Sequence, residues 1–260
     1  MTEGKTVEKI GEIKEKLAAL GDRELASFIR QYSSDERSGV IKLVDTARKR
    51  CDRYEKELQR TEALKKYEKE YDKYSYICGI DEVGRGPLAG PVCAAAVILP
   101  EHLEIPGLND SKKLTDKRRR ELFPVIQEQA IAYGIGFASQ EEIDSINILQ
   151  ATFLAMRRAL EHLKVKPDLA LIDGNRQTDF GVPCKTVVKG DSLSANIAAA
   201  SVLAKVSRDD WMLRAAEEYP GYGFEIHKGY GTKAHYAALE QLGPCAIHRN
   251  TFLRKFYEHK

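Results

Sequence analysis

The chain has 260 residues, of which 43% are hydrophobic and 31% charged, and this composition excludes a disordered or fibrous protein. Its 41 Lys and Arg residues nearly balance its 39 Asp and Glu residues, so no overall basic charge points to a nucleic-acid partner and any basic or acidic surface must be local. No run approaches the roughly 20 apolar residues of a membrane span, and residues 1–5 lead into charged sequence rather than into the apolar core of a signal peptide.

The first segment, residues 1–74, is rich in Lys and Glu and poor in Gly and Pro, which predicts a helical N-terminal extension. Residues 21–22 and 33–35 read as helix ends followed by new starts, and residues 45–74 as one long charged helix. An alternative is an arm that holds nucleic acid through the 48–50 Arg-Lys-Arg run, Lys65 and Lys66. Equal acidic content weakens that alternative. The apolar residues at helical spacing are Ile10, Ile13, Leu17, Leu20, Leu25, Phe28, Ile29 and Tyr32.

From residue 75 to residue 260 the pattern changes to alternating strands and helices. Strands are expected at 76–80, 91–99, 131–137, 169–172 and 184–188, and helices at 116–129, 143–163 and about 192–218. Three closely joined strands followed by strand–helix alternation predict an α/β catalytic domain with a mixed sheet flanked by helices.

The cysteines indicate the compartment. They are five in number, scattered and without a C-x-x-C pair, which predicts buried thiols in a reducing environment rather than a disulfide frame or a zinc site. We therefore expect a cytoplasmic protein. These residues are Cys51, Cys78, Cys93, Cys184 and Cys245.

Acidic residues stand where three of the expected strands end. Asp81 and Glu82 follow the first strand, Asp173 the fourth and Asp191 the fifth. Ligands of α/β sheets bind beyond strand ends, so these carboxylates can converge. Two carboxylates about 4 Å apart repel by roughly 4 kcal/mol at an effective dielectric near 20. Hard oxygen ligands without His or Cys favour Mg²⁺ or Mn²⁺, and two such ions can activate water and stabilise the leaving oxygen of a phosphodiester.

Each acid also has a structural explanation. Asp173 with Gly174 is a common turn pair, and Asp191 could cap the helix expected from residue 192. Neighbouring residues of a regular strand face opposite ways, so Asp81 and Glu82 reach one cluster only if the backbone bends there, and we expect such a bend. The nearby glycines do not form a dinucleotide-binding loop, because prolines and strand sequence follow instead of a helix.

Several ordered motifs in the α/β part resemble those of the ribonuclease HII family, also called type 2 ribonuclease H. The run from Gly79 to Val92 (GIDEVGRGPLAGPV) resembles the family signature, and the run from Asn109 to Leu114 (NDSKKL) resembles its second block. Further matches are LIDG at 171–174, KGD at 189–191, IAAASVLAKVSRD at 197–209, YGF at 222–224 and HKGYGT at 227–232. The likeness spans about residues 76–254, and some members carry a helical N-terminal extension.

This resemblance implies a ribonuclease H-like fold and an endonuclease that cleaves the RNA strand of RNA–DNA hybrids. It also implies incision on the 5′ side of ribonucleotides embedded in duplex DNA, leaving 3′-hydroxyl and 5′-phosphate ends, as in ribonucleotide excision repair. Its catalytic metal ligands, for Mn²⁺ or Mg²⁺, would be Asp81, Glu82, Asp173 and Asp191. Members are commonly monomers, and we expect no obligate protein partner and no membrane association.

The resemblance also assigns substrate-binding residues. A Gly-Arg-Gly loop falls on Gly84, Arg85 and Gly86, and a substrate-sensing tyrosine on Tyr230. Backbone groups flanked by glycine can approach the 2′-hydroxyl that distinguishes RNA, while the tyrosine ring could stack on the following deoxyribose. Ser111 and Lys112 are candidate phosphate contacts, although a solvated loop would explain them too.

Four alternatives to these assignments stay open, two for single residues or pairs and two for the protein as a whole. Tyr230 could be a loop aromatic that packs locally, and Lys205 with Asp209, four residues apart, could be a structural ion pair. A sibling enzyme could prefer long hybrids and ignore single ribonucleotides. A nucleic-acid-binding protein without catalytic activity is the alternative from a different functional class, and the presence of all four acids disfavours it.

Overall fold

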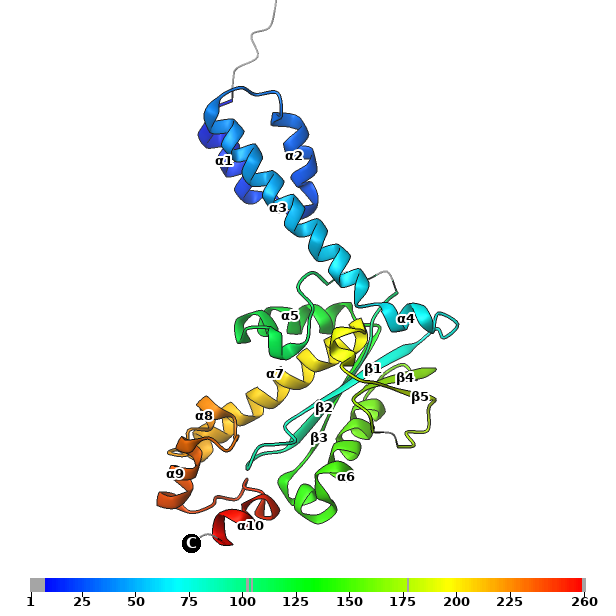
Figure 1. Ribbon diagram of the computed structural model, residues 1–260, viewed down its shortest axis with the longest axis vertical. Coiled ribbons are helices and arrows are strands. Elements are labelled where there is room, and N and C mark those ends of the chain that lie inside the picture. The colour runs from blue at the N-terminus through cyan, green and yellow to red at the C-terminus, as the bar shows by residue number, and fades with distance from the viewer. Residues whose placement is uncertain (1–7, 102, 104, 177, 259–260) are drawn as a thin grey trace, which may run out of the picture. The chain divides into compact units, whose positions relative to one another are not determined.

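The computed structural model describes residues 8–101, 103, 105–176 and 178–258, and the chain divides into two compact units between Glu62 and Ala63 (Figure 1). The expectation that residues 1–5 belong to no signal peptide lies outside the described residues. Along the described part of the chain, none of the helices combines the length and the apolar character that crossing a bilayer requires.

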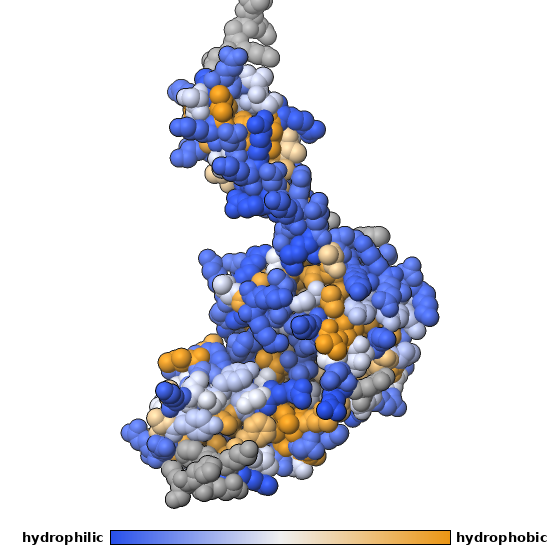
Figure 2. Space-filling model, in the orientation of Figure 1, coloured by the Kyte–Doolittle hydropathy of each residue, from blue (hydrophilic) through white to orange (hydrophobic). Residues whose placement is uncertain are grey.

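The first unit is built from helices α1 (Ile10–Ala19), α2 (Leu25–Tyr32) and α3 (Ser38–Ala63), with a short 3₁₀ turn η1 (Asp22–Glu24) between the first two. Their apolar stripes meet in one small core, and the face of this unit that Figure 2 shows is mostly hydrophilic with a smaller hydrophobic area. Arg50 of α3 donates to the carbonyl of Leu20 at 2.8 Å and pairs with Asp22 at 2.6 Å, which fastens the α1 end to α3. The core residues are Ile13, Leu17, Leu25, Phe28, Tyr32, Val40, Val44 and Ala47.

The single long helix expected over residues 45–74 is wrong, because α3 ends at Ala63 and a separate helix α4 (Lys66–Glu70) follows. Leu64 is buried in the core of the second unit, and Lys65 pairs as an isolated β-bridge with Ser194. The Lys65 ammonium is largely buried and donates to the carbonyl of Glu101 at 2.9 Å, so it is not a free nucleic-acid contact. Residues 63–74 thus belong to the same compact unit as the α/β part. The domain boundary expected at residue 74 stays a prediction.

A five-stranded mixed sheet forms the centre of the second unit, as expected. The strands are β1 (Ile77–Val83), β2 (Val92–Ile98), β3 (Ala132–Ala138), β4 (Leu169–Asp173) and β5 (Cys184–Val187), in the order β3-β2-β1-β4-β5. The first three pair antiparallel, whereas β4 and β5 run parallel to β1. Parallel pairing brings the ends of β1 and β4 together, because Ile80 lies beside Ile172.

Helices cover both faces of this sheet (Figure 1). Helices α5 (Asp116–Gln129) and α7 (Ala195–Glu218) lie on one face, and α6 (Gln140–Glu161) lies on the other. Strand β2 is apolar and buried along its whole length, and β1 is apolar and buried from Ile77 to Ile80, as expected for central strands with helices on each side. At Gly79 a Cβ atom would lie 2.2 Å from the backbone of Asn196, so glycine is what lets α7 approach β1.

Two helix starts differ from expectation because their caps lie elsewhere. Helix α6 begins at Gln140, where Ser139 and Glu142 form a capping box, and α7 begins at Ala195 with Ser194 as its cap. Glu68 of α4 reinforces this second cap by accepting hydrogen bonds from Ser194 and from the Asn196 amide. After α7 the chain ends in three helices, α8 (Phe224–His227), α9 (Lys233–Leu242) and α10 (Asn250–Glu258).

Candidate active site

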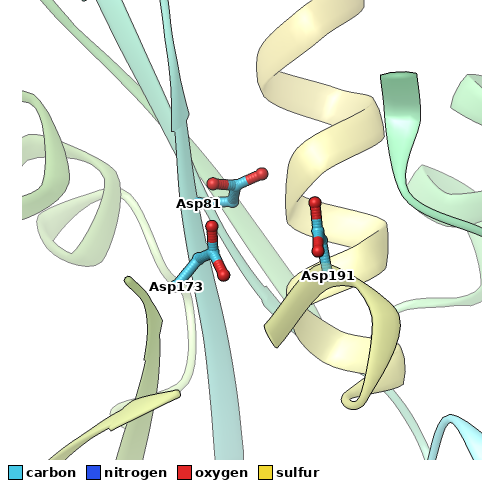
Figure 3. Close-up of side chains that lie close together, drawn as sticks. All are labelled: Asp81, Asp173 and Asp191. Carbon is cyan, nitrogen blue, oxygen red and sulfur yellow. The ribbon is translucent and has the colours of Figure 1, made fainter. Parts of the chain in front are cut away.

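Three of the four expected carboxylates converge where the pairing between β1 and β4 ends. Asp81, Asp173 and Asp191 each offer a carboxylate oxygen, and these oxygens all lie within 4.8 Å of one another. Figure 3 shows Asp81 and Asp173 side by side on the sheet, with Asp191 facing them from the turn before α7. The register explains the first pair, because Asp81 follows Ile80 and Asp173 follows its neighbour Ile172.

Asp81 is buried in the second unit, with 5% of its surface exposed. Burial raises its pKa well above the ordinary aspartate value, and repulsion from Glu82 and Asp173 raises it further. Hydrogen bonds from Ser201 and from the Glu82 amide, which donates at 2.8 Å, act in the opposite direction. The carboxylate is therefore held in one orientation while its negative charge remains poorly compensated.

Asp191 reaches the cluster from a 3₁₀ turn, η3 (Gly190–Ser192). Lys189 adopts the left-handed conformation at φ 58°, and the Gly190 amide that follows donates to the Asp173 carboxylate at 2.6 Å. Burial, with repulsion from Asp173 and Asp110, raises the pKa of Asp191 to about 6. The expectation that Asp191 could cap the long helix is wrong, because Ser194 is the cap.

Glu82 does not join this group, and the expected backbone bend is wrong. The β1–β2 pairing continues regularly through Asp81, Glu82 and Val83, so Glu82 leaves the opposite face of the strand from Asp81. Its carboxylate lies 3.4 Å from the Arg85 guanidinium. Burial raises the pKa of Glu82, Arg85 lowers it and the charge of Asp173 raises it, so Glu82 remains within electrostatic range of the cluster.

The chemistry of the three carboxylates fits a divalent cation. They are all-oxygen ligands that lie close together, and burial and repulsion from neighbouring carboxylates raise the pKa of both Asp81 and Asp191. Hard cations such as Mg²⁺ and Mn²⁺ take such ligands, and a bound cation would offset this repulsion. The residues present therefore suit an oxygen-liganded divalent metal.

The segment before α5 supplies charged and polar neighbours. The Lys112 ammonium is exposed and lies 3.9 Å from the Asp191 carboxylate. Burial opposes its positive charge, but Asp81 and Asp191 together raise the pKa of Lys112. Ser111 is buried, and its hydroxyl lies 2.8 Å from that of Ser201, so its hydroxyl already has a partner. Phosphate contact by Ser111 or Lys112 stays a prediction.

The Gly84-Arg85-Gly86 loop and Tyr230 lie next to each other. A Cβ atom built on Gly86 would lie 3.9 Å from the Tyr230 ring, and the Leu88 amide donates to the Gly229 carbonyl at 2.8 Å. Tyr230 is 40% exposed, so its side chain is partly open to solvent beside this loop. Gly84, at φ +92°, starts the loop directly after β1 ends.

Four residues that contact the carboxylates or the Gly84–Gly86 loop were not predicted from the sequence. One predicted pair is confirmed. Lys205 and Asp209 do form an ion pair, at 2.8 Å on α7. The missed residues are Ser201, Asp110, Arg208 and Arg249, which contact the carboxylates or the loop through side-chain hydrogen bonds and charge. Ser201 could have been found, because it falls in the apolar, buried part of the helix, where a polar residue needs a partner.

Two family models match the chain. The model described as "Ribonuclease HII" matches residues 78–259, and the model described as "Ribonuclease HII N-terminal domain" matches residues 9–72. Residues 76–254, where the motif resemblance was found, thus coincide closely with the first match.

Curated proteins and solved structures agree with these matches. Ribonuclease HII of Clostridioides difficile strain 630 is 48% identical over 94% of this chain and 97% of its own length, and that of Geotalea uraniireducens is 58% identical over 69% and 83%. The crystal structure of ribonuclease H2 from Pyrococcus horikoshii aligns with a TM-score of 0.58 at 27% identity, covering 71% of this chain and 98% of that one. Ribonuclease HII in a complex with PCNA from Archaeoglobus fulgidus aligns with a TM-score of 0.57 at 25% identity, covering 67% and 94%.

Proposed function

Since this chain belongs to the ribonuclease HII family, we propose that it incises duplex DNA on the 5′ side of embedded ribonucleotides as well as cleaving the RNA strand of RNA–DNA hybrids. As a member of the family it is a ribonuclease H, a hydrolase that acts on phosphodiester bonds. The products proposed are 3′-hydroxyl and 5′-phosphate ends. Such incision would start ribonucleotide excision repair, which we propose as its role in the cytoplasm.

Asp81, Asp173 and Asp191 are the proposed catalytic and metal-binding residues. Bound among them, two Mg²⁺ or Mn²⁺ ions would supply an activated water and stabilise the leaving oxygen of the scissile phosphodiester. The support is their mutual distance of at most 4.8 Å and the uncompensated charge of two of them. Glu82 is the proposed fourth ligand. Its carboxylate lies close enough to feel the charge of Asp173, and a cation bound among the carboxylates would offset that repulsion and attract Glu82.

The loop Gly84–Gly86 and Tyr230 are proposed to read the ribonucleotide. A 2′-hydroxyl can donate and accept, so main-chain groups of a glycine-flanked loop can recognise it at short range. The half-exposed Tyr230 ring, beside Gly86, would stack on the sugar that follows, where a further hydroxyl would clash. Ser111 and Lys112 are the proposed phosphate contacts, and Lys112 is exposed beside Asp191.

The carboxylate triplet carries the proposal, and one assay tests it. A duplex of DNA with a single embedded ribonucleotide is incubated with full-length protein and Mg²⁺ or Mn²⁺, and the cut position and both new ends are mapped. We expect incision 5′ of the ribonucleotide, and loss of cleavage with retained duplex binding in Asp81→Asn. The matched control is Asp72→Asn, which changes an exposed aspartate outside the site.

Three outcomes would contradict the proposal. Full activity of Asp81→Asn would remove the site assignment. Cleavage of a long RNA–DNA hybrid without incision at a single ribonucleotide would identify a sibling enzyme with the other preference. Binding of both duplexes without cleavage of either would identify a silent binding protein.

We propose that the protein acts as a monomer without an obligate partner. The Archaeoglobus structure is of a complex with PCNA, so a sliding clamp is the partner to test. Light scattering of the chain during the incision assay, with and without a clamp protein, would decide between independent and clamp-dependent activity.

A further inference from the structure

Two arginines of the second unit are completely buried. Arg208 on α7 and Arg249 just before α10 both have 0% of their surface exposed. Burying a guanidinium costs several kcal/mol unless its donors are satisfied. In the described part of the chain, the hydrogen bonds of these two side chains go to main-chain carbonyl oxygens. Because burying two guanidinium groups costs free energy, their hydrogen bonds indicate that the position of these carbonyl oxygens matters.

Two of these carbonyls, those of Gly84 and Arg85, belong to the loop that the proposed function assigns to ribonucleotide reading, and the others lie in the segments that flank this loop and Tyr230. Arg249 donates to Gly84 at 2.6 Å, Arg85 at 3.0 Å and Gly90 at 2.9 Å. Its planar fork therefore holds the loop after β1 at both ends. Lysine, with one ammonium, cannot reproduce this geometry.

Arg208 connects the same loop to the tyrosine segment. It donates to Pro91 at 2.9 Å and Ala89 at 3.2 Å, and on its other side to Lys228 at 3.0 Å, two residues before Tyr230. Its guanidinium also lies 5.9 Å from the centre of the Tyr230 ring, within range of a cation–π interaction.

Glycine makes the close approach to Arg208 possible. A Cβ atom at Gly84 would lie 2.1 Å from the Arg208 side chain. Any other residue at this position would displace the guanidinium, in addition to the strain of its φ of +92°.

Peptide geometry then determines what the loop presents outward. In a planar trans peptide the carbonyl of one residue and the amide N–H of the next point in roughly opposite directions. Because Arg249 draws the Gly84 and Arg85 carbonyls inward, the amides of Arg85 and Gly86 turn away from the core. Two adjacent donors are thereby directed at whatever binds over the loop.

We infer that Arg208 and Arg249 are positioning residues that orient the Gly84–Gly86 amides and fix their distance from Tyr230. This inference rests on the proposed function, because it gives these amides a ribonucleotide to read. Neither arginine touches the substrate. Arg249 remains protonated at neutral pH, since burial and the charge of Arg208 lower its pKa only to about 9.

The test compares two substrates in one variant. Arg249→Lys keeps the charge and most of the volume but removes the fork. A single embedded ribonucleotide offers one 2′-hydroxyl, so it depends on accurate placement of the loop, whereas a long hybrid offers a 2′-hydroxyl at every step. We expect kcat/KM for single-ribonucleotide incision to fall about tenfold to a hundredfold more than kcat/KM for the long hybrid. Arg208→Lys should act in the same direction.

The control is Arg158→Lys, which alters an arginine on α6 that holds Glu142 and the Phe137 carbonyl on the other face of the sheet. The folded fraction is checked by fluorescence of Trp211, the only tryptophan of the chain. If Arg249 and Arg208 were merely structural, both activities would fall in parallel and the ratio would stay at that of wild type, which would overturn the inference. Failure of the wild-type protein to incise at a single ribonucleotide would instead overturn the proposed function.

Discussion

Replacing Asp81 by Asn should stabilise the protein in the absence of metal, although it should abolish cleavage. The three clustered carboxylate oxygens lie within 4.8 Å of one another, and two unit charges at that distance repel by about 3.5 kcal/mol at an effective dielectric near 20. Partial protonation relieves some of this repulsion, because burial raises the pKa of Asp81. We therefore expect a gain of about 2 kcal/mol, or about 4 to 8 °C in Tm for a unit of this size.

The pH dependence of this gain has a defined sign. A carboxyl group whose pKa is raised in the folded state contributes stability below its unfolded pKa and loses that contribution as pH rises through the folded value. Wild type and Asp81→Asn should thus be similar near pH 4, and the advantage of the variant should grow toward pH 8. Burial and repulsion raise the pKa of Asp191 in the same way, to about 6, so the cluster gains negative charge over this interval.

Metal should reverse the order of stability. A ligand at 100 times its Kd stabilises the folded state by about 2.7 kcal/mol, and the variant, with one ligand fewer, should gain less. Urea unfolding followed by Trp211 fluorescence, in EDTA and in Mn²⁺, measures both effects, because Trp211 lies on α7 in the second unit. Asp72→Asn serves as the control. A variant less stable than wild type in EDTA would refute the reasoning that the carboxylates repel one another.

Three further changes have expected outcomes. Glu68→Ala removes a hydrogen-bond acceptor from the start of α7 and should lower the free energy of unfolding, measured in urea, by about 1 to 2 kcal/mol. The control Glu70→Ala changes an exposed residue and should leave it unchanged. Equal urea midpoints for the two variants would contradict a role of Glu68 in capping α7. Tyr230→Ala should reduce single-ribonucleotide incision by about tenfold or more. Tyr230→Phe should retain it, because the proposed stacking on the sugar uses the ring and not the hydroxyl. A similar loss in both variants would implicate the hydroxyl instead. Burial, together with the charge of His235, lowers the pKa of His248 to about 4, so stability should fall as pH drops from about 6.5 to about 4, by up to about 3 kcal/mol. His248→Asn should flatten that part of the pH–stability curve, and an unchanged slope would exclude His248 as its source.

The strand pattern was sufficient to predict the convergence of Asp81, Asp173 and Asp191. Each follows an apolar strand, and parallel neighbours end at the same edge of a sheet. Pattern alone did not fix where the first strand ends, because Asp and Glu are poor strand formers and yet β1 pairs through Val83. That pairing is why Glu82 lies on the opposite face from Asp81.

The burial of Arg208 and Arg249 could not be predicted from the local sequence pattern. Arg208 sits in a helix with many charged residues toward its end, where a solvated side chain is the usual outcome. Its partners are carbonyls of Ala89, Pro91 and Lys228, which lie far away along the sequence. The break at Leu64 was likewise hidden, because it arises from packing of Leu64 in the core of the second unit rather than from any helix-breaking residue.

Helix α7 sets the distance between the two parts of the proposed site, the carboxylates and the Gly84–Gly86 loop. Ser201, which bonds to Asp81, and Arg208, which holds the reading loop, are separated by seven residues, almost two turns of helix or about 10 Å. One inserted residue between them would turn Arg208 aside by about 100° without moving Ser201. The spacing of Ser201 and Arg208 along α7 would then set the position of the cut relative to the ribonucleotide. We therefore expect insertions and deletions to be tolerated in loops but not between Ser201 and Arg208.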